Sequence, residues 1–145
     1  MQSFEKLRPL TLLLLRFALG AIFLYHGYPK LFTHTRETMQ FFSRSGLPGY
    51  SVYLVGIVEF FGGILLVAGL FTRIVGLLLT GEMAVALWKV HGILSNPLQV
   101  HNYEFPLAVA VAAFALATFG AGPISLDQAV SLQGRKSSRK PKARD

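Results

Sequence analysis

The chain has 145 residues, of which 52% are hydrophobic and 14% are charged, and its mean hydropathy is +0.49. A soluble domain carries about 25% charged residues, so this composition is typical of a membrane protein. The length predicts one domain. Without cysteine the chain has no disulfide, thiol redox centre or thiolate metal ligand. The net charge of +7 comes mainly from a basic C-terminus rather than a folded surface, so we do not expect nucleic-acid binding.

Four apolar segments follow one another along the chain, at residues 9–28, 52–71, 74–90 and 105–121. Each has about the 17–25 residues that a helix needs to cross the hydrocarbon core. Because backbone amides in lipid must bond within their own segment, all four segments are predicted to be helical. The sequence therefore predicts an all-α protein, an integral membrane four-helix bundle.

The first segment could also be a secretory signal peptide, with Lys6 and Arg8 as its basic region and LTLLLL as its apolar core. Arg16 interrupts that core, and apolar residues continue well beyond it. This pattern favours a retained transmembrane helix.

Arg16 belongs to a stripe of residues spaced by 4, 3, 4 and 3 positions, which lie on one face of a helix. The stripe consists of Arg16, Gly20, Phe23, Gly27 and Lys30. Its glycines predict close approach of a second helix, as small residues allow in membrane bundles. We therefore expect Arg16 to face protein rather than lipid.

A charge inside the membrane usually has a partner, because leaving it unpaired costs about 2.5 kcal/mol or more. Glu59 in the second segment and Glu82 in the third are at suitable depths, so Arg16, Glu59 and Glu82 are predicted to form an intramembrane polar cluster. The cluster could fix the register of the helices. Alternatively it could bind a proton or a ligand, because two carboxylates exceed one cation.

The distribution of Lys and Arg predicts that both termini are cytoplasmic, with nine cations on that side and four on the other. The nine are Lys6, Arg8, Arg73, Arg135, Lys136, Arg139, Lys140, Lys142 and Arg144, and the four are Lys30, Arg36, Arg44 and Lys89. We expect a transmembrane domain over residues 1–130 and a disordered basic tail over residues 131–145. The tail would serve as a topology signal and attract anionic lipids.

The outer ends of the predicted helices carry a second set of polar side chains. This candidate outer-face site consists of His26, Lys30, His91, Tyr103 and Glu104. These residue types are typical of an interfacial belt, and they could also form a site for a quinone headgroup or a haem or metal ligand pair. No tight ligand spacing such as HxxxH is present, so we predict no metal site. No catalytic residue can be assigned from the sequence.

Several short motifs, in a fixed order, resemble the DoxX family of membrane proteins (DoxX/DoxD-like) from about residue 10 to residue 130. They are R-F-x-L-G and H-G-Y-P-K-L, then E-F-F-G-G-I-L-L-V-A-G-L-F-T-R, then E-M-A-V-A, Y-E-F-P and G-A-G-P-I-S-L-D. The residues that match the family pattern are Arg16, Gly27, Lys30, Glu59, Gly63, Gly69, Arg73, Met83, Glu104 and Asp127.

The resemblance implies a multi-pass protein of the bacterial cytoplasmic (inner) membrane, with four helices. Relatives include a subunit of a thiosulfate:quinone oxidoreductase and membrane components associated with redox defence. It therefore implies a redox-linked, quinone-associated membrane subunit or accessory protein, with a soluble or membrane oxidoreductase subunit as its partner. Quinone is the candidate cofactor and haem is not favoured. The alternative is a non-catalytic scaffold or small-solute carrier. Whether the chain is itself enzymatic, and whether it forms homo-oligomers, both stay open.

Overall fold

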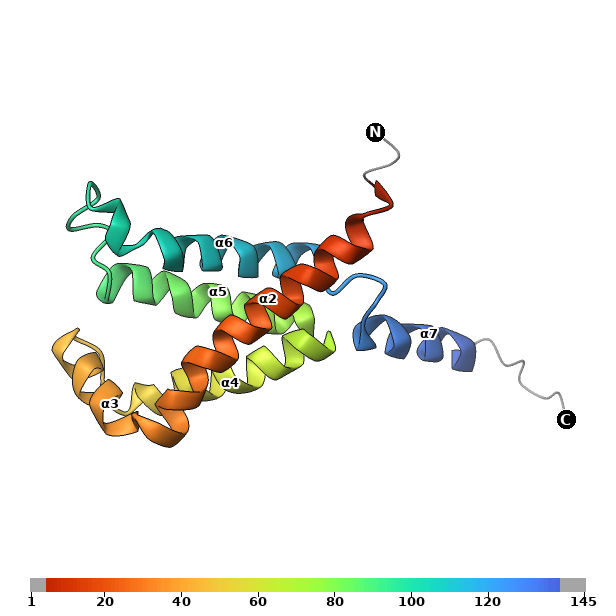
Figure 1. Cartoon of the computed structure of the whole chain (residues 1–145). Helices are drawn as coiled ribbons and strands as arrows, with labels where there is room; N and C mark the ends of the chain where they lie inside the picture. The colour runs from red at the N-terminus through yellow and green to blue at the C-terminus, as the bar shows by residue number, and fades with distance from the viewer. Residues whose placement is uncertain (1–4, 139–145) are drawn as a thin grey trace, which may run out of the picture.

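The computed structural model describes residues 5–138, and this part of the chain contains helices and no strand (Figure 1). Four long helices correspond to the four predicted segments, and each boundary lies within three residues of its prediction. They are α2 (Arg8–Tyr28), α4 (Ser51–Ala68), α5 (Thr72–Lys89) and α6 (Glu104–Phe119). The all-α prediction is therefore confirmed.

Shorter elements lie between and after the long helices. They are a π-helical turn (Pro29–Thr33), α3 (Thr35–Arg44), a 3₁₀ turn (Val100–Asn102) and α7 (Leu126–Ser138). α3 was not predicted from the sequence. The structure also differs from the predicted disordered tail, because residues 131–138 continue α7. The rest of that tail, residues 139–145, lies outside the described residues.

The long helices pack as two pairs. α2 packs along α4 and α5 packs along α6, while contacts between α4 and α5 join the pairs. Figure 1 shows α5 and α6 side by side, with α2 crossing the bundle obliquely. Glycine lets α5 and α6 approach each other closely. A Cβ on Gly76 of α5 would lie 2.8 Å from the carbonyl oxygen of Ala113 in α6.

The core lies where all four long helices meet. Its largest members are fully buried apolar side chains, and they come from every helix: Phe23, Leu66, Leu79 and Leu116. A smaller cluster of Leu87, Tyr103 and Ala110 closes one end between α5 and α6.

The opposite end of the bundle contains the tight turn from α4 to α5. Gly69 ends α4 with a left-handed backbone (φ 70°), and the N–H of Leu70 donates to the carbonyl of Leu65 (3.0 Å). This is a common glycine-based helix ending. The start of α2 and the start of α7 lie at this same end, and α7 then projects away from the bundle (Figure 1).

Two helices are long and apolar enough to cross a membrane by length and composition. They are α2 with its π-helical extension, residues 8–33, and α4, residues 51–68. α6 is apolar but has 16 residues, and α5 carries Arg73, Glu82 and Lys89. A membrane bundle in which all four helices span, with both termini cytoplasmic, stays a prediction.

Candidate functional site

A buried ion pair joins the π-helical turn at the end of α2 to α4. The Nζ of Lys30 donates to Oε2 of Glu59 and also to the carbonyl of His26 at 3.3 Å. The Glu59 side chain is 4% exposed and that of Lys30 is 16% exposed, so the pair is largely removed from solvent. An ion pair in such a place is costly to break, because the remaining partner becomes an uncompensated buried charge.

The backbone at Lys30 is unusual. Pro29 has no N–H to continue the α-helical bonding of α2, and the N–H of His34 donates to the carbonyl of Pro29 (2.7 Å), five residues earlier. The resulting π-helical turn, Pro29–Thr33, contains Lys30. Single π turns in helices occur frequently at functional sites.

Glycines let the backbones of α2 and α4 approach closely next to the pair. A Cβ on Gly27 would lie 2.5 Å from the backbone nitrogen of Phe60, and a Cβ on Gly63 would lie 2.8 Å from the carbonyl oxygen of Gly20. Gly20, Phe23 and Gly27 are all buried, as is Arg16. The predicted close-packed stripe on the first helix is therefore confirmed.

Glu82, on α5, brings a second carboxyl to the ion pair. It lies close enough to Glu59 and Lys30 for their charges to act on it. Both carboxyl oxygens of Glu82 are buried, and neither has a hydrogen-bond partner within the described residues. Buried polar atoms normally form hydrogen bonds, so we expect an unpartnered carboxyl to bind a proton or a ligand. Lys30, Glu59 and Glu82 are called the carboxyl cluster below.

Arg16 lies elsewhere, at the end of the bundle where α4 ends. Its side chain is 2% exposed, and its guanidinium donates four hydrogen bonds to backbone carbonyls. The acceptors are Leu66 (3.0 Å), Val67 (3.3 Å), Ala121 (2.7 Å) and Ile124 (2.7 Å). Two of these carbonyls belong to the last turn of α4, where unsatisfied carbonyls and the helix dipole favour a cation.

The predicted pairing of Arg16 with Glu59 or Glu82 is wrong. Glu59 precedes Leu66 by seven residues on α4, which is about 10 Å along the helix axis, and its carboxylate binds Lys30. Depth along the predicted segments favoured a carboxylate partner, whereas the acceptors are carbonyls. Lys30 was predicted to lie on the same stripe, and it is the cation that binds Glu59.

Asp127 completes the end of the bundle that holds Arg16. Its carboxylate accepts hydrogen bonds from the backbone N–H groups of Phe71 (2.7 Å) and Thr72 (3.0 Å), at the start of α5. Its own N–H donates to the carbonyl of Gly69 (2.9 Å). Asp127 therefore acts as an N-cap supplied from a distant segment. The motif G-A-G-P-I-S-L-D includes Asp127, but nothing in the sequence indicates that its partners are the N–H groups of Phe71 and Thr72.

The residues of the candidate outer-face site make mostly local contacts. Tyr103 donates to the carbonyl of Pro97 (2.6 Å), and Glu104 lies 3.3 Å from Nδ1 of His101. The ring of His26 stacks on Phe105 with centroids 6.2 Å apart.

Lys30 links the carboxyl cluster to His26 through the His26 carbonyl. The structure places His91 just after α5 and partly buried, and no hydrogen bond within residues 5–138 joins its side chain to the others. No group of three or more His, Asp or Glu side chains in the described part of the chain could hold a metal ion. Convergence of these residues on one site stays a prediction.

A chain of aromatic rings lies beside the carboxyl cluster. Tyr28 and Phe32 have ring centroids 5.1 Å apart, Phe32 and Phe60 are 5.5 Å apart, and Phe60 and Phe61 are 5.3 Å apart. Tyr28, Phe32 and Phe61 are each about half exposed. The rings therefore form an apolar strip along α2, the π-helical turn and α4, with neighbouring rings tilted or edge-to-face, next to a buried ion pair.

The architecture is thus that of an all-α protein whose first two long helices enclose an ion pair. Residues 11–92 match the DoxX family, and the chain belongs to that family.

Curated relatives match over most of both chains. A protein of Bacillus subtilis named "Putative oxidoreductase CatD" is 37% identical over 124 residues, which cover 86% of this chain and 89% of the relative. Two Escherichia coli proteins are named inner membrane protein YphA, at 30% identity over 87% of this chain and 94% of its own, and inner membrane protein YqjF, at 26% over 86% and 95%. No solved structure matches the chain.

Proposed function

We propose that the chain is a multi-pass inner-membrane subunit of a quinone-linked oxidoreductase, and that the carboxyl cluster exchanges protons with the bound quinone. The observation that carries this proposal is the carboxyl of Glu82, buried without a hydrogen-bond partner within the described residues beside the Lys30–Glu59 pair. The relative in Bacillus subtilis is named as an oxidoreductase, and those in Escherichia coli as inner membrane proteins.

Membrane placement is supported by the surface as well as the family. Large apolar side chains are exposed around the long helices, among them Leu14, Leu54, Leu77 and Val111. Such a continuous apolar exterior is rare on soluble monomers. We propose that all four long helices span and that both termini are cytoplasmic.

The cluster suits proton exchange because its charges do not balance. Lys30 compensates Glu59, which leaves Glu82 as the surplus carboxyl. A bare carboxylate without hydrogen bonds is strongly disfavoured in an apolar interior. Glu82 therefore holds a proton that it can give up when a ligand supplies compensation, as ionisable groups inside membranes commonly do.

The aromatic strip suits a quinone ring. Offset stacking on Tyr28 and Phe32 would place a flat ring next to the turn that carries Lys30. Reduction of a quinone to a quinol takes up two electrons and two protons. In this proposal a partner oxidoreductase subunit supplies the two electrons, and Glu82 passes on the two protons one at a time, taking up a proton from water after the first transfer.

Binding of a short-tailed quinone to the purified chain in nanodiscs tests the proposal. We expect saturable binding to the wild type, and at least about tenfold weaker binding for Glu82→Gln, equivalent to about 1.4 kcal/mol. Glu37→Gln, which changes an exposed carboxyl on α3, is the matched control and should bind as the wild type does. Absence of saturable binding would remove quinone from the proposal.

The second candidate is a proton-coupled carrier of a small solute, also built on the unpartnered Glu82. It predicts proton movement into chain-loaded liposomes without any quinone, which Glu82→Gln abolishes. Proton movement of that kind, with no quinone binding, would favour the carrier.

A further inference from the structure

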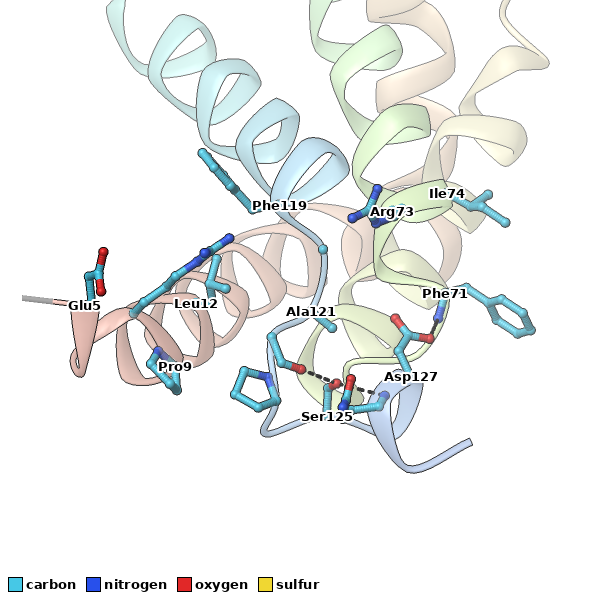
Figure 2. Close-up of a pocket in the computed structure, with 15 residues that line it drawn as sticks. Glu5, Pro9, Leu12, Phe71, Arg73, Ile74, Phe119, Ala121, Ser125 and Asp127 are labelled. Atoms are coloured by element: carbon cyan, nitrogen blue, oxygen red, sulfur yellow. Dashed lines mark hydrogen bonds between the residues drawn. The ribbon is translucent and has the colours of Figure 1, made fainter. Parts of the chain in front are cut away.

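The end of the bundle opposite the carboxyl cluster contains a cavity of about 680 Å³ (Figure 2). It lies between the start of α2, the start of α5, the end of α6 and the segment that leads into α7. A volume of about 300–1,000 Å³ is usual for ligand sites in proteins. None of its lining residues belongs to the carboxyl cluster.

Two arginines line this cavity and flank the end of α6. The guanidinium carbon of Arg8 lies 5.8 Å from the centroid of the Phe119 ring. Nε of Arg73 packs against the next residue, since a Cβ on Gly120 would lie 3.1 Å from it. Both side chains are exposed, and within residues 5–138 neither forms an ion pair.

The two acidic residues of the lining do not cancel these cations. Asp127 already accepts two backbone hydrogen bonds, from Phe71 and Thr72. Glu5 lies at the outer edge, beyond Pro9 and on the side away from Arg73 (Figure 2). The interior of the cavity therefore presents two guanidinium groups that are available to an anion.

The walls of the cavity are apolar. Leu12 and Pro9 come from α2, Ile74 comes from α5, and Phe119 comes from α6. Ile74 and Phe119 are each 59% exposed, so the apolar wall continues onto the outer surface of the helices. An occupant with a charged head and an apolar body fits this combination.

We propose that this cavity binds the phosphate group of an anionic ligand, with Arg8 and Arg73 as its partners. The planar guanidinium donates two parallel hydrogen bonds to phosphate oxygens and matches that geometry better than an ammonium does. Arg8 and Arg73 begin two of the long helices, so they lie at the level where phospholipid headgroups meet a bundle that spans a membrane. Basic pockets between helices bind anionic lipids in this position. The proposal does not depend on the redox role.

Native mass spectrometry of the full chain tests this, with phosphatidylglycerol and phosphatidylcholine offered in equal amounts. We expect the wild type to retain phosphatidylglycerol, and Arg8→Gln/Arg73→Gln to lose that preference by about tenfold. Arg36→Gln/Arg44→Gln is the matched control, because it removes two exposed arginines of α3 at the other end of the bundle and leaves the basic tail unchanged. Its preference should equal that of the wild type.

Inorganic phosphate added as a competitor distinguishes the two sources of the group. Phosphatidylglycerol retained at millimolar phosphate assigns the site to a lipid headgroup, and displacement assigns it to a soluble phosphate. Arg73→Gln alone, at an exposed position, gives the same readout if the double variant does not fold. Equal retention by the two double variants would overturn the proposal, as would retention of both lipids in equal amounts by the wild type.

Discussion

Arg16 shows how a permanent cation can be accommodated in an apolar helix without an acidic partner. Its guanidinium carries five N–H donors in a fixed plane, and four carbonyls from two segments accept from it. Gly69 leaves room for the group, since a Cβ there would lie 2.7 Å from Cζ of Arg16. The residue thus joins the end of α4 to the segment that follows α6.

Replacing Arg16 by methionine should strongly destabilise the protein. Hydrogen bonds to a charged group contribute about 1.5–3 kcal/mol each, and buried carbonyls left unpaired add a penalty, so we expect a loss on the order of 3–5 kcal/mol. Thermal unfolding in detergent measures it. Arg36→Met, at an exposed position on α3, is the control and should change stability little. A similar effect of both substitutions would contradict the role of the four carbonyls.

Arg16 and Lys30 should behave differently toward Glu59. Lys30→Met and Glu59→Gln each break the buried pair, so the double variant should cost less than the sum of the single variants, with a coupling of about 0.5–3 kcal/mol. Arg16→Met and Glu59→Gln should be additive, because Arg16 bonds to carbonyls instead. The two double-mutant cycles, followed by thermal unfolding, check this. Coupling between Arg16→Met and Glu59→Gln would contradict this and would support the pairing of Arg16 with Glu59 that the sequence suggested.

At residue scale, the sequence was informative about which side chains are buried and less so about their partners. Glu59 and Arg16 were predicted to lie inside the bundle because charges in apolar segments face protein, and both are buried. The acceptors of Arg16 are main-chain carbonyls. Because every residue has one, the amino-acid sequence does not indicate which carbonyls will accept. Lys30 was assigned to the outer face because it follows an apolar run, although its chain reaches inward to Glu59.

At the scale of the helix, the contact between α2 and α4 depends on the absence of side chains. Gly20 faces Gly63, and Gly27 faces the backbone of Phe60. In lipid, helices associate through close packing rather than through the hydrophobic effect, so small residues at the contact matter more than large apolar ones. The ion pair lies directly beside this contact.

Gly27→Ala should therefore destabilise the protein, while Gly81→Ala should not. The new Cβ at position 27 would lie 2.5 Å from a backbone nitrogen, and overpacking of this kind costs about 1–3 kcal/mol. At position 81 nothing lies within 4 Å of an added Cβ, and alanine favours a helix by about 1 kcal/mol over glycine. Thermal unfolding of both variants provides the comparison. If Gly81→Ala also destabilised the protein, the effect at position 27 could not be assigned to a steric clash with α4.

The long helices were predictable and the short ones were not. The four apolar segments predicted α2, α4, α5 and α6, and the structure has a helix in each of them. α3 has the mixed composition TRETMQFFSR and depends on its packing against α4. The start of α7 is stabilised by the hydrogen bonds that Asp127 accepts from Phe71 and Thr72, which lie 55 or more positions away, and by a local hydrogen bond from Ser125 to the carbonyl of Gly122.

For the whole molecule, the number of helices that cross the membrane decides where the loops lie. If all four long helices span, the loop at Pro97 and the C-terminal segment at Gly134 lie on opposite sides. If only α2 and α4 span, Pro97 and Gly134 lie on the same side, because both positions follow the second span and no later helix crosses the membrane.

Paired reporter fusions at Pro97 and Gly134 distinguish these arrangements. We expect an alkaline phosphatase fusion to be active at Pro97 and inactive at Gly134, with a fluorescent-protein fusion giving the reverse pattern, because cations are enriched on the cytoplasmic side. A fusion at Pro48, before α4, should report the same side as Pro97. The same signal from Pro97 and Gly134 would support two spans.

The acceptors of Arg16 have a consequence for how the protein is made. Ala121 and Ile124 follow Arg16 by 105 and 108 residues, and ribosomes add about 5–20 residues per second. For roughly 5–20 s during synthesis the first helix therefore carries a guanidinium without two of its four acceptors. Those acceptors become available only when α6 and residues 120–124 have been made. A chain truncated before residue 121 never acquires these two acceptors. Its partly unpaired guanidinium gives membrane proteases a physical basis for telling incomplete chains from finished ones.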